Sequence, residues 1–414
     1  MTLTLQRPEV TRRVFLLGAL AAGAGCSKER LASLGRRDAL RAASAYLWGR
    51  QGEDGGWHST EYGLLRSGQS LTGLVLNALL CIPKPLSDLP PDRMMAAVSF
   101  LMDHIDGDGA VGRMDPDVAD YPNYATALAL QAFCRAPMPL RIFSPFALVE
   151  CLRRQQFTEA NGWTPEDAAY GGWGMGGDVR TPPAPGHVDL SMTRHVLEAL
   201  AASGVPAGDP AFEKAAVFLK KCQNFIPGVE ATGHDMADRD GGFFFSPVVV
   251  DANKAGRTST GFRSYGSPTA DGILSLLAIG RGLDDARVRA AADWLVSRHS
   301  DESVPDFDDI RVGQSTRGLW FYYAAASTAA LSKLGLPLQP ALSPALLERQ
   351  RGDGSWVNRE KRVKEDEPLI ATALAVRALV AEVASEDSLS RQGYSSLPLR
   401  FVSVRNRWPS VLVT

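Results

Sequence analysis

One sequence pattern recurs along the chain and limits the folds that it can adopt. The pattern consists of an amphipathic helix, a Gly-containing turn that usually carries an aromatic residue, and a more apolar second helix. The clearest copy joins residues 42–50 to residues 71–80 through the turn Gln-Gly-Glu-Asp-Gly-Gly-Trp at 51–57. A single helix pair cannot bury both of its faces, so successive pairs must stack on one another. Six pairs stacked at a constant angle can close into a ring.

Five further copies of the pattern follow, and they differ mainly in the turn. The second copy has Val111 where the first has Trp57, and the fifth has no aromatic residue in its turn. The sequence therefore predicts an all-α fold, an α/α toroid of about six helical hairpins over residues 38–384, with a C-terminal tail over 385–414 packed on it. First helices are expected at 42–50, 95–104, 148–156, 212–223, 288–299 and 342–350, and second helices at 71–80, 124–134, 191–202, 269–279, 318–334 and 369–380.

The residues of the turn have a physical role in joining the pairs. Glycine adopts the positive φ that lets the chain leave a helix and reverse, and glutamine offers both a donor and an acceptor to helix ends. A buried tryptophan adds at most roughly 4 to 6 kcal/mol by area. These effects explain the motif without chemistry, so we expect a structural role for Trp57, Trp163, Trp173 and Trp356.

The phrase Gln-x-x-x-Gly-Gly-Trp resembles the QW motif of squalene and oxidosqualene cyclases, which occurs in a weaker form in the β-subunits of protein prenyltransferases. The resemblance extends over residues 38–382 and rests on several repeats. It implies the α/α-toroid fold and an apolar, isoprenoid-like ligand in a central cavity. Squalene cyclases have two such domains with the active site between them, whereas this chain has the length for one.

The first 26 residues have the organisation of an export signal. Arg12-Arg13, with Phe15 two positions on, precedes an apolar run over residues 17–25, which is shorter than the roughly 20 residues of a membrane span. This pattern resembles the twin-arginine signal, and it predicts export to the periplasm or cell envelope. Cys26 resembles the lipidated cysteine of a lipobox, which would anchor the chain to a membrane; alternatively, cleavage follows residues 22–24. Residues 27–37 are then a short linker.

Charge and cysteine usage exclude several classes of function. Lys and Arg number 44 against 46 Asp and Glu, a net charge of -2, so no basic field is available for nucleic acid. The five cysteines form no C-x-x-C pair, and no D-x-C of the prenyltransferase zinc site occurs. The six histidines are dispersed along the chain. We therefore expect no metal and no cofactor, and buried free thiols in preference to disulfides.

One acidic motif is a candidate for catalysis. Asp306, Asp308 and Asp309 form D-x-D-D, which resembles the motif with which squalene-hopene cyclases protonate an alkene. That chemistry requires a protonated carboxylic acid that faces an apolar cavity. Arg311 lies nearby and favours ionised aspartates, so a solvated acidic loop is the alternative interpretation.

Two regions supply candidates for ligand binding. The long Gly-rich segment 233–272 carries basic residues before a helix whose free N-terminal amides could meet an anionic group. The inner helices bring aromatic residues toward the centre of the ring, where they suit an isoprenoid-like ligand, although aromatic residues are also common in cores. The candidates are Lys254, Arg263, Tyr265, Asp271, Tyr124, His195, Trp320, Tyr322 and Tyr323.

Three functions are compatible with these features. The first is an exported toroid that binds a lipid, isoprenoid or peptide without converting it. The second is a terpenoid cyclase or isoprenyl-transfer enzyme that uses the acidic loop 306–309. The third is carbohydrate processing, which needs two carboxylates facing each other about 5 to 9.5 Å apart. Export favours the first, because diphosphate substrates are made mainly in the cytoplasm.

Overall fold

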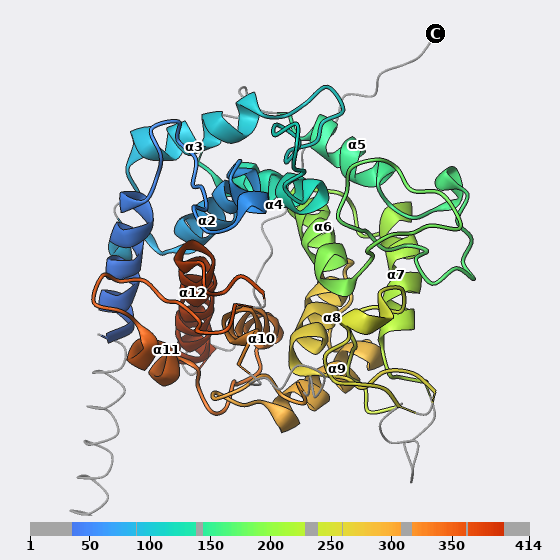
Figure 1. The fold of residues 1–414 in the computed structure, drawn as a ribbon. Helices are drawn as coiled ribbons and strands as arrows, with labels where there is room; N and C mark the ends of the chain where they lie inside the picture. The colour runs from blue at the N-terminus through green and yellow to red at the C-terminus, as the bar shows by residue number, and fades with distance from the viewer. Residues whose placement is uncertain are drawn as a thin grey trace, which may run out of the picture.

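A computed structural model of the chain describes residues 35–87, 89–137, 144–227, 239–258, 260–307, 317–361 and 363–392. Within these ranges twelve helices form two concentric layers around one axis (Figure 1). The described ranges contain no β-strand, and their β-type pairing is limited to three isolated β-bridges. The predicted all-α toroid of six hairpins is therefore confirmed.

The inner layer is a closed ring of six helices. Each inner helix packs against the next one in the chain, and α12 packs against α2, which closes the circle. The inner helices are α2 (Gln69–Cys81), α4 (Pro122–Arg135), α6 (Leu190–Ala202), α8 (Gly266–Ala278), α10 (Trp320–Leu334) and α12 (Pro368–Gln392).

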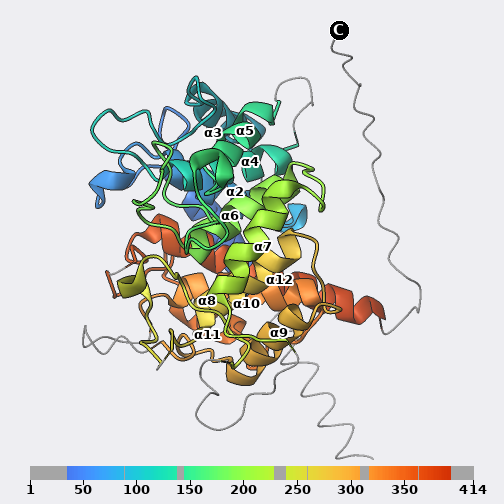
Figure 2. The same ribbon diagram turned by 90° about the vertical axis from the view of Figure 1, so that its right-hand side faces the viewer.

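The outer layer contains the first helix of each hairpin. In the side view, α7 of this layer lies in front of α6 and α8 (Figure 2). The outer helices are residues 35–49, α3 (Pro91–Asp103), α5 (Phe146–Arg154), α7 (Pro210–Cys222), α9 (Ala286–Arg298) and α11 (Ser343–Arg349).

Burial distinguishes the two layers as the sequence pattern predicts. Every residue of α2 from Gln69 to Leu79 is buried, because neighbours cover all of its faces. On α3 only one stripe is buried, namely Met94, Ala97, Val98, Phe100 and Leu101. An inner helix is therefore buried on nearly every face, whereas an outer helix buries one face.

Glutamine side chains join each of four hairpins to the next one. The amide of Gln156 donates to the carbonyl of Gly171 in its own turn at 3.0 Å and to that of Ala211, in the first turn of α7, at 2.9 Å. Each bond contributes about 1 kcal/mol, and together they fix the angle between hairpins. The same paired bonds are made by Gln51 to Gly55 and Arg93, by Gln223 to Gly241 and Arg287, and by Gln350 to Gly354 and Ala39.

The turn aromatics connect the two helices within a hairpin. The indole of Trp173, which is fully buried, donates to the carbonyl of Leu152 at the end of α5. Its backbone amide donates to the hydroxyl of Thr193 on α6. Trp57 and Trp356 make equivalent bonds, which confirms their structural placement. Trp163 differs, because its indole donates to Arg180.

The last hairpin contacts the first directly. Gln350 donates to the carbonyl of Ala39, and Arg36 donates to Ser343. Ser59 also donates to Glu367 just before α12. Because the first and last hairpins share the contacts that the others make along the ring, no terminal face is left to cap.

Parts of the sequence predictions fall outside the described residues. The signal segment 1–26, including Cys26, and residues 393–414 of the predicted tail lie outside them. No helix in the described ranges is long and apolar enough to cross a bilayer.

Cys81, Cys134, Cys151 and Cys222 carry free thiols, and Cys134 is exposed, contrary to the burial expected of it.

The turn glycines permit the close approach of neighbouring hairpins, which gives a stability test. Gly171 has φ +84, and a Cβ there would lie 1.9 Å from the carbonyl oxygen of Lys214 on α7. Gly204 has φ +88 but open space around it. We expect Gly204→Ala to cost about 1 to 2 kcal/mol from backbone strain alone, and Gly171→Ala to cost at least about 3 kcal/mol. Urea unfolding measures both, and equal costs would contradict the close-approach argument.

Candidate functional site

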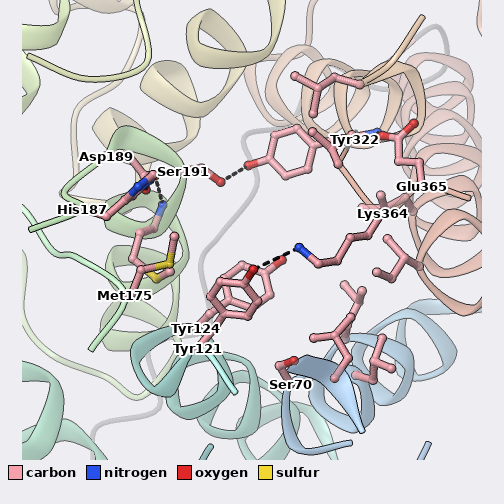
Figure 3. A pocket seen from close by; sticks show the side chains of 18 of the residues that line it. Ser70, Tyr121, Tyr124, Met175, His187, Asp189, Ser191, Tyr322, Lys364 and Glu365 are labelled. Atoms are coloured by element: carbon pink, nitrogen blue, oxygen red, sulfur yellow. Dashed lines mark hydrogen bonds and ion pairs between the residues drawn. The ribbon is translucent and has the colours of Figure 1, made fainter. Parts of the chain in front are cut away.

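A central cavity of about 350 Å³ lies at the end of the ring where the inner helices begin (Figure 3). Most of its wall comes from the first turns of α2, α4, α6, α10 and α12 and from the segments that precede them. Its apolar lining comprises Leu65, Leu71, Leu74, Met175, Met192, Phe245, Leu319, Val363, Ile370 and Leu374, and its polar lining comprises Ser70, Tyr121, Tyr124, His187, Asp189, Ser191, Tyr322, Lys364 and Glu365.

Tyr322 connects the cavity to a buried carboxylate. Its hydroxyl lies 2.6 Å from Ser191 Oγ and 3.0 and 2.9 Å from the two carboxylate oxygens of Asp271. Asp271 is buried behind the lining and forms an ion pair with Arg194 at 3.1 Å. Burial raises the pKa of Asp271 to about 6, although Arg194 opposes the shift. Asp271 therefore positions Tyr322 and does not itself face the cavity.

Tyr124 and His195 form a second hydrogen-bonded pair at the wall. His195 Nδ1 lies 2.8 Å from the carbonyl of Ser191, which can only accept, so Nδ1 carries the proton. Its Nε2 then accepts from the hydroxyl of Tyr124 at 3.3 Å. Burial, with the nearby charge of Arg194, lowers the pKa of His195 to about 3. His195 is neutral at physiological pH and orients Tyr124.

Asp189 is a carboxyl group in the cavity wall. It immediately precedes α6, and one oxygen caps that helix by accepting from the amide of Met192 at 2.8 Å. The other oxygen lies 3.0 Å from Nε2 of His187. Asp189 is 3% exposed, whereas the His187 side chain is 35% exposed and also lines a second cavity of about 180 Å³. A buried carboxyl group thus has a partner that reaches solvent.

Lys364 extends across the cavity from the segment before α12. Its Nζ donates to the hydroxyl of Tyr121 at 3.0 Å (Figure 3). The ammonium also lies 5.7 and 5.4 Å from the ring centres of Tyr62 and Tyr121. Lys364 and Tyr121 both have positive φ, 62° and 44°. Such strained backbone is uncommon outside glycine and is concentrated at functional sites.

Glu365 holds the same segment against α10. Its carboxylate accepts from the backbone amides of Phe321 and Tyr322 at 3.2 and 2.8 Å and from the side chain of Asn358 at 2.9 Å. These amides belong to the first turn of α10, where they have no partner within the helix. Glu365 therefore caps the N-terminus of α10 although it is distant from that helix in sequence. Burial raises the pKa of Glu365 to about 7, opposed by these hydrogen bonds.

The structure places the sequence-predicted binding residues in two groups. Tyr124 and Tyr322 line the cavity, and His195 and Asp271 contact them from behind. The other five are absent from the cavity lining. Lys254 is half-buried and Arg263 exposed in the segment before α8, Tyr265 packs on Phe307, Trp320 donates to Asp301, and Tyr323 hydrogen-bonds His299.

The predicted acidic motif is only partly described. Asp306 has φ +54, and its carboxylate lies 2.8 Å from Arg298 on the outer helix α9. Its side chain is 47% exposed and does not line the cavity. Asp308 and Asp309 lie outside the described residues.

Sequence reasoning missed the acidic and basic residues of the cavity lining, namely His187, Asp189, Lys364 and Glu365. The sequence does contain a signal for Asp189, because an aspartate directly before an apolar helix is typical of a helix N-cap. The N-cap of an inner helix lies at the end of the ring where the cavity is. For Lys364 the signal is weaker: a charged run, Lys364 to Glu367, immediately precedes the last inner helix. No group of three His, Cys, Asp or Glu residues in the described ranges could hold a metal ion.

Comparison with known proteins identifies the type of fold. No protein-family model matches the chain, and no curated protein matches it. The structure resembles that of an Asp-to-Asn variant of the type II terpene cyclase MstE from Scytonema, in complex with its substrate geranylgeranyl dihydroxybenzoate. The TM-score is 0.53 at 15% identity, covering 86% of this chain and 99% of that chain. An Asp-to-Ala variant of MstE in complex with the product merosterolic acid A is similar with a TM-score of 0.52 at 15% identity, and the comparison covers the same shares of the two chains. This chain therefore has a terpenoid cyclase-like α/α-toroid fold.

The raised pKa of Glu365 leads to a prediction of how the free energy of unfolding depends on pH. Its pKa is raised from 4.5 to about 7, so the folded state holds a proton that the unfolded state releases near pH 4.5. Its contribution to stability is therefore present below pH 4.5 and is lost as the pH rises through 7, by at most about 3 kcal/mol. Asp271 acts in the same direction up to about pH 6.

We expect Glu365→Gln to flatten the dependence of the free energy of unfolding on pH between 6 and 7. Glu302→Gln, at an exposed position, is the matched control and should retain the wild-type slope. Urea unfolding across pH 4 to 8 measures both. An unchanged slope in the Glu365 variant would show that Glu365 is ionised throughout.

Proposed function

We propose that the chain binds an elongated, apolar, isoprenoid-like ligand in the central cavity. The observation that carries this proposal is the cavity itself, which lies at one end of the inner ring and is lined mainly by aliphatic and aromatic side chains. Its volume of about 350 Å³ falls within the range of small-molecule sites. Tyr121, Tyr124 and Tyr322 supply aromatic surface and a small number of hydroxyl groups that fix orientation.

The comparisons support the ligand class by analogy. The terpene cyclase MstE has the same type of fold and is seen with a geranylgeranyl substrate and with its product. The twin-arginine pattern at Arg12 and Arg13 adds a proposal on location, namely that this protein acts outside the cytoplasm. A ligand available there is more compatible with binding an intact isoprenoid lipid than with consuming a freshly made diphosphate.

Filling the cavity tests the proposal. Leu374 of α12 lines the cavity, so Leu374→Trp should place its extra bulk in the ligand space. Leu283→Trp adds the same bulk at a position that is 39% exposed and serves as the control. We expect farnesol and geranylgeraniol to bind the wild type and the control, and to bind the Leu374 variant at least about tenfold more weakly. Native mass spectrometry measures occupancy, and equal occupancy in all three proteins would rule out this cavity as the site.

A second candidate function is favoured by the pair formed by Asp189 and His187. Protonation of an alkene requires a carboxyl group that holds a proton in a largely apolar wall, and Asp189 has the position that this role requires. Asp189 would transfer its proton to a terminal alkene, the next double bond would close a ring on the resulting cation, and loss of a proton would end the reaction. His187, which reaches the second cavity, would return a proton to Asp189. The overall reaction is an isomerisation, so no oxidant is needed.

Asparagine substitution separates this function from binding. Asp189→Asn keeps an oxygen that can cap α6, so the fold and the binding of geranylgeraniol should be retained. Any cyclisation measured with the wild type should fall by at least about 100-fold. Asp306→Asn is the control, because Asp306 lies at the surface beside Arg298 and outside the cavity lining. Unchanged turnover in the Asp189 variant would eliminate Asp189 as the proton donor.

A further inference from the structure

We infer that Lys364 and Tyr121 form a head-group site, and that the ligand of the cavity is an apolar chain that ends in a carboxylate. This inference rests on the proposed function, because it names the polar end of the ligand that the cavity would hold. Lys364 is the one lysine or arginine in the described lining of the cavity. A positive charge beside an otherwise apolar ligand space selects for a negative group on the ligand.

The acidic neighbours of Lys364 are bound to other partners. Glu365 accepts from the backbone amides of Phe321 and Tyr322 in the first turn of α10. Asp366 accepts a hydrogen bond from the hydroxyl of Tyr62. Glu367 accepts from Ser59 at 2.5 Å. Within the described residues no carboxylate pairs with the Lys364 ammonium, whose hydrogen-bond partner is a neutral tyrosine.

The geometry of the pair suits an anionic acceptor. Lys364 Nζ has three protons, and the bond to Tyr121 uses one of them. The Tyr121 hydroxyl accepts that bond and still has its own proton to donate. Both groups can therefore donate to a single carboxylate placed between them in the cavity, as two oxygens accept two donors. Replacing a neutral partner with a carboxylate strengthens the bonds of the ammonium.

Backbone strain marks the same two residues. The described chain has three non-glycine residues with positive φ, namely Tyr121, Asp306 and Lys364. Two of these three lie 243 positions apart in sequence and yet their side chains meet. Strain at functional positions persists where the surroundings fix the conformation, and the hydrogen bonds of Glu365, Asp366 and Glu367 hold the segment that contains Lys364.

The charge balance at the site favours a carboxylate over a diphosphate. A diphosphate carries two or more negative charges and is usually held by several basic groups or by a metal ion. This site offers one lysine, and the buried Asp189 and Glu365 also belong to the cavity wall. One lysine and one tyrosine hydroxyl match a single negative charge.

Three probes that share the farnesyl hydrocarbon chain and differ in the head group test the inference. Farnesol, farnesoic acid and farnesyl diphosphate are each titrated by calorimetry into the full-length protein. The variant is Lys364→Met, which keeps an unbranched apolar side chain of similar shape and removes the ammonium group. Lys361→Met makes the same change at an exposed position three residues away. Tyr121→Phe removes the second donor, and thermal unfolding checks that every variant is folded.

We expect the wild type and the Lys361 variant to bind the acid at least about tenfold more tightly than the alcohol. Lys364→Met should abolish this preference and leave alcohol binding unchanged, and Tyr121→Phe should reduce the preference in part. Equal binding of acid and alcohol by the wild type, or an unaltered preference in Lys364→Met, would overturn the head-group site alone. Tighter binding of the diphosphate than of the acid would overturn the choice of a carboxylate. If none of the three binds the wild type, the proposed ligand class fails as well.

Discussion

The closure of the inner ring is the constraint on which the rest of this structure depends. The inner helices are buried on nearly all sides, so each is stable only where two inner neighbours and an outer helix cover it. The turns maintain that arrangement through repeated bonds: a glutamine reaches the start of the next outer helix, and a tryptophan reaches the end of the previous one. Because α12 packs on α2, the arrangement has no exposed end.

Ring closure also determines where chemistry can occur. The first turns of α2, α4, α6, α10 and α12, together with the segments that precede them, meet at one end of the ring and form most of the wall of one cavity. The deeper part of the ring is occupied by buried polar groups such as Arg194 and Asp271, which satisfy one another. Asp271 orients Tyr322 toward the cavity, and His195 orients Tyr124 in the same way. The polar interior thus supports the site, while the mouth of the ring carries it.

The sequence predicted the parts of the fold that repeat. Trp57, Trp173 and Trp356 recur at matching positions with glutamine and glycine, so their role could be inferred from comparison within one chain. Tyr124 and Tyr322 could be placed because they occupy inner helices near their starts. Lys364 and Tyr121 could not, because their hydrogen bond depends on where ring closure places the segment before α12 relative to the segment before α4. Asp189 was overlooked because the acidic run at 306–309 has a more familiar pattern, although Asp306 lies at the surface.

The positions of Asp189 and Lys364 constrain how a ligand would lie. They project from opposite walls of the cavity, one from the start of α6 and the other from the segment before α12 (Figure 3). A chain whose carboxylate is held by Lys364 would direct its apolar end away from that charge. The apolar end would then approach the wall that contains Asp189, which is where a proton donor would have to act on a terminal alkene. Binding of the head group and protonation of the tail are therefore compatible in one orientation, and either could operate without the other.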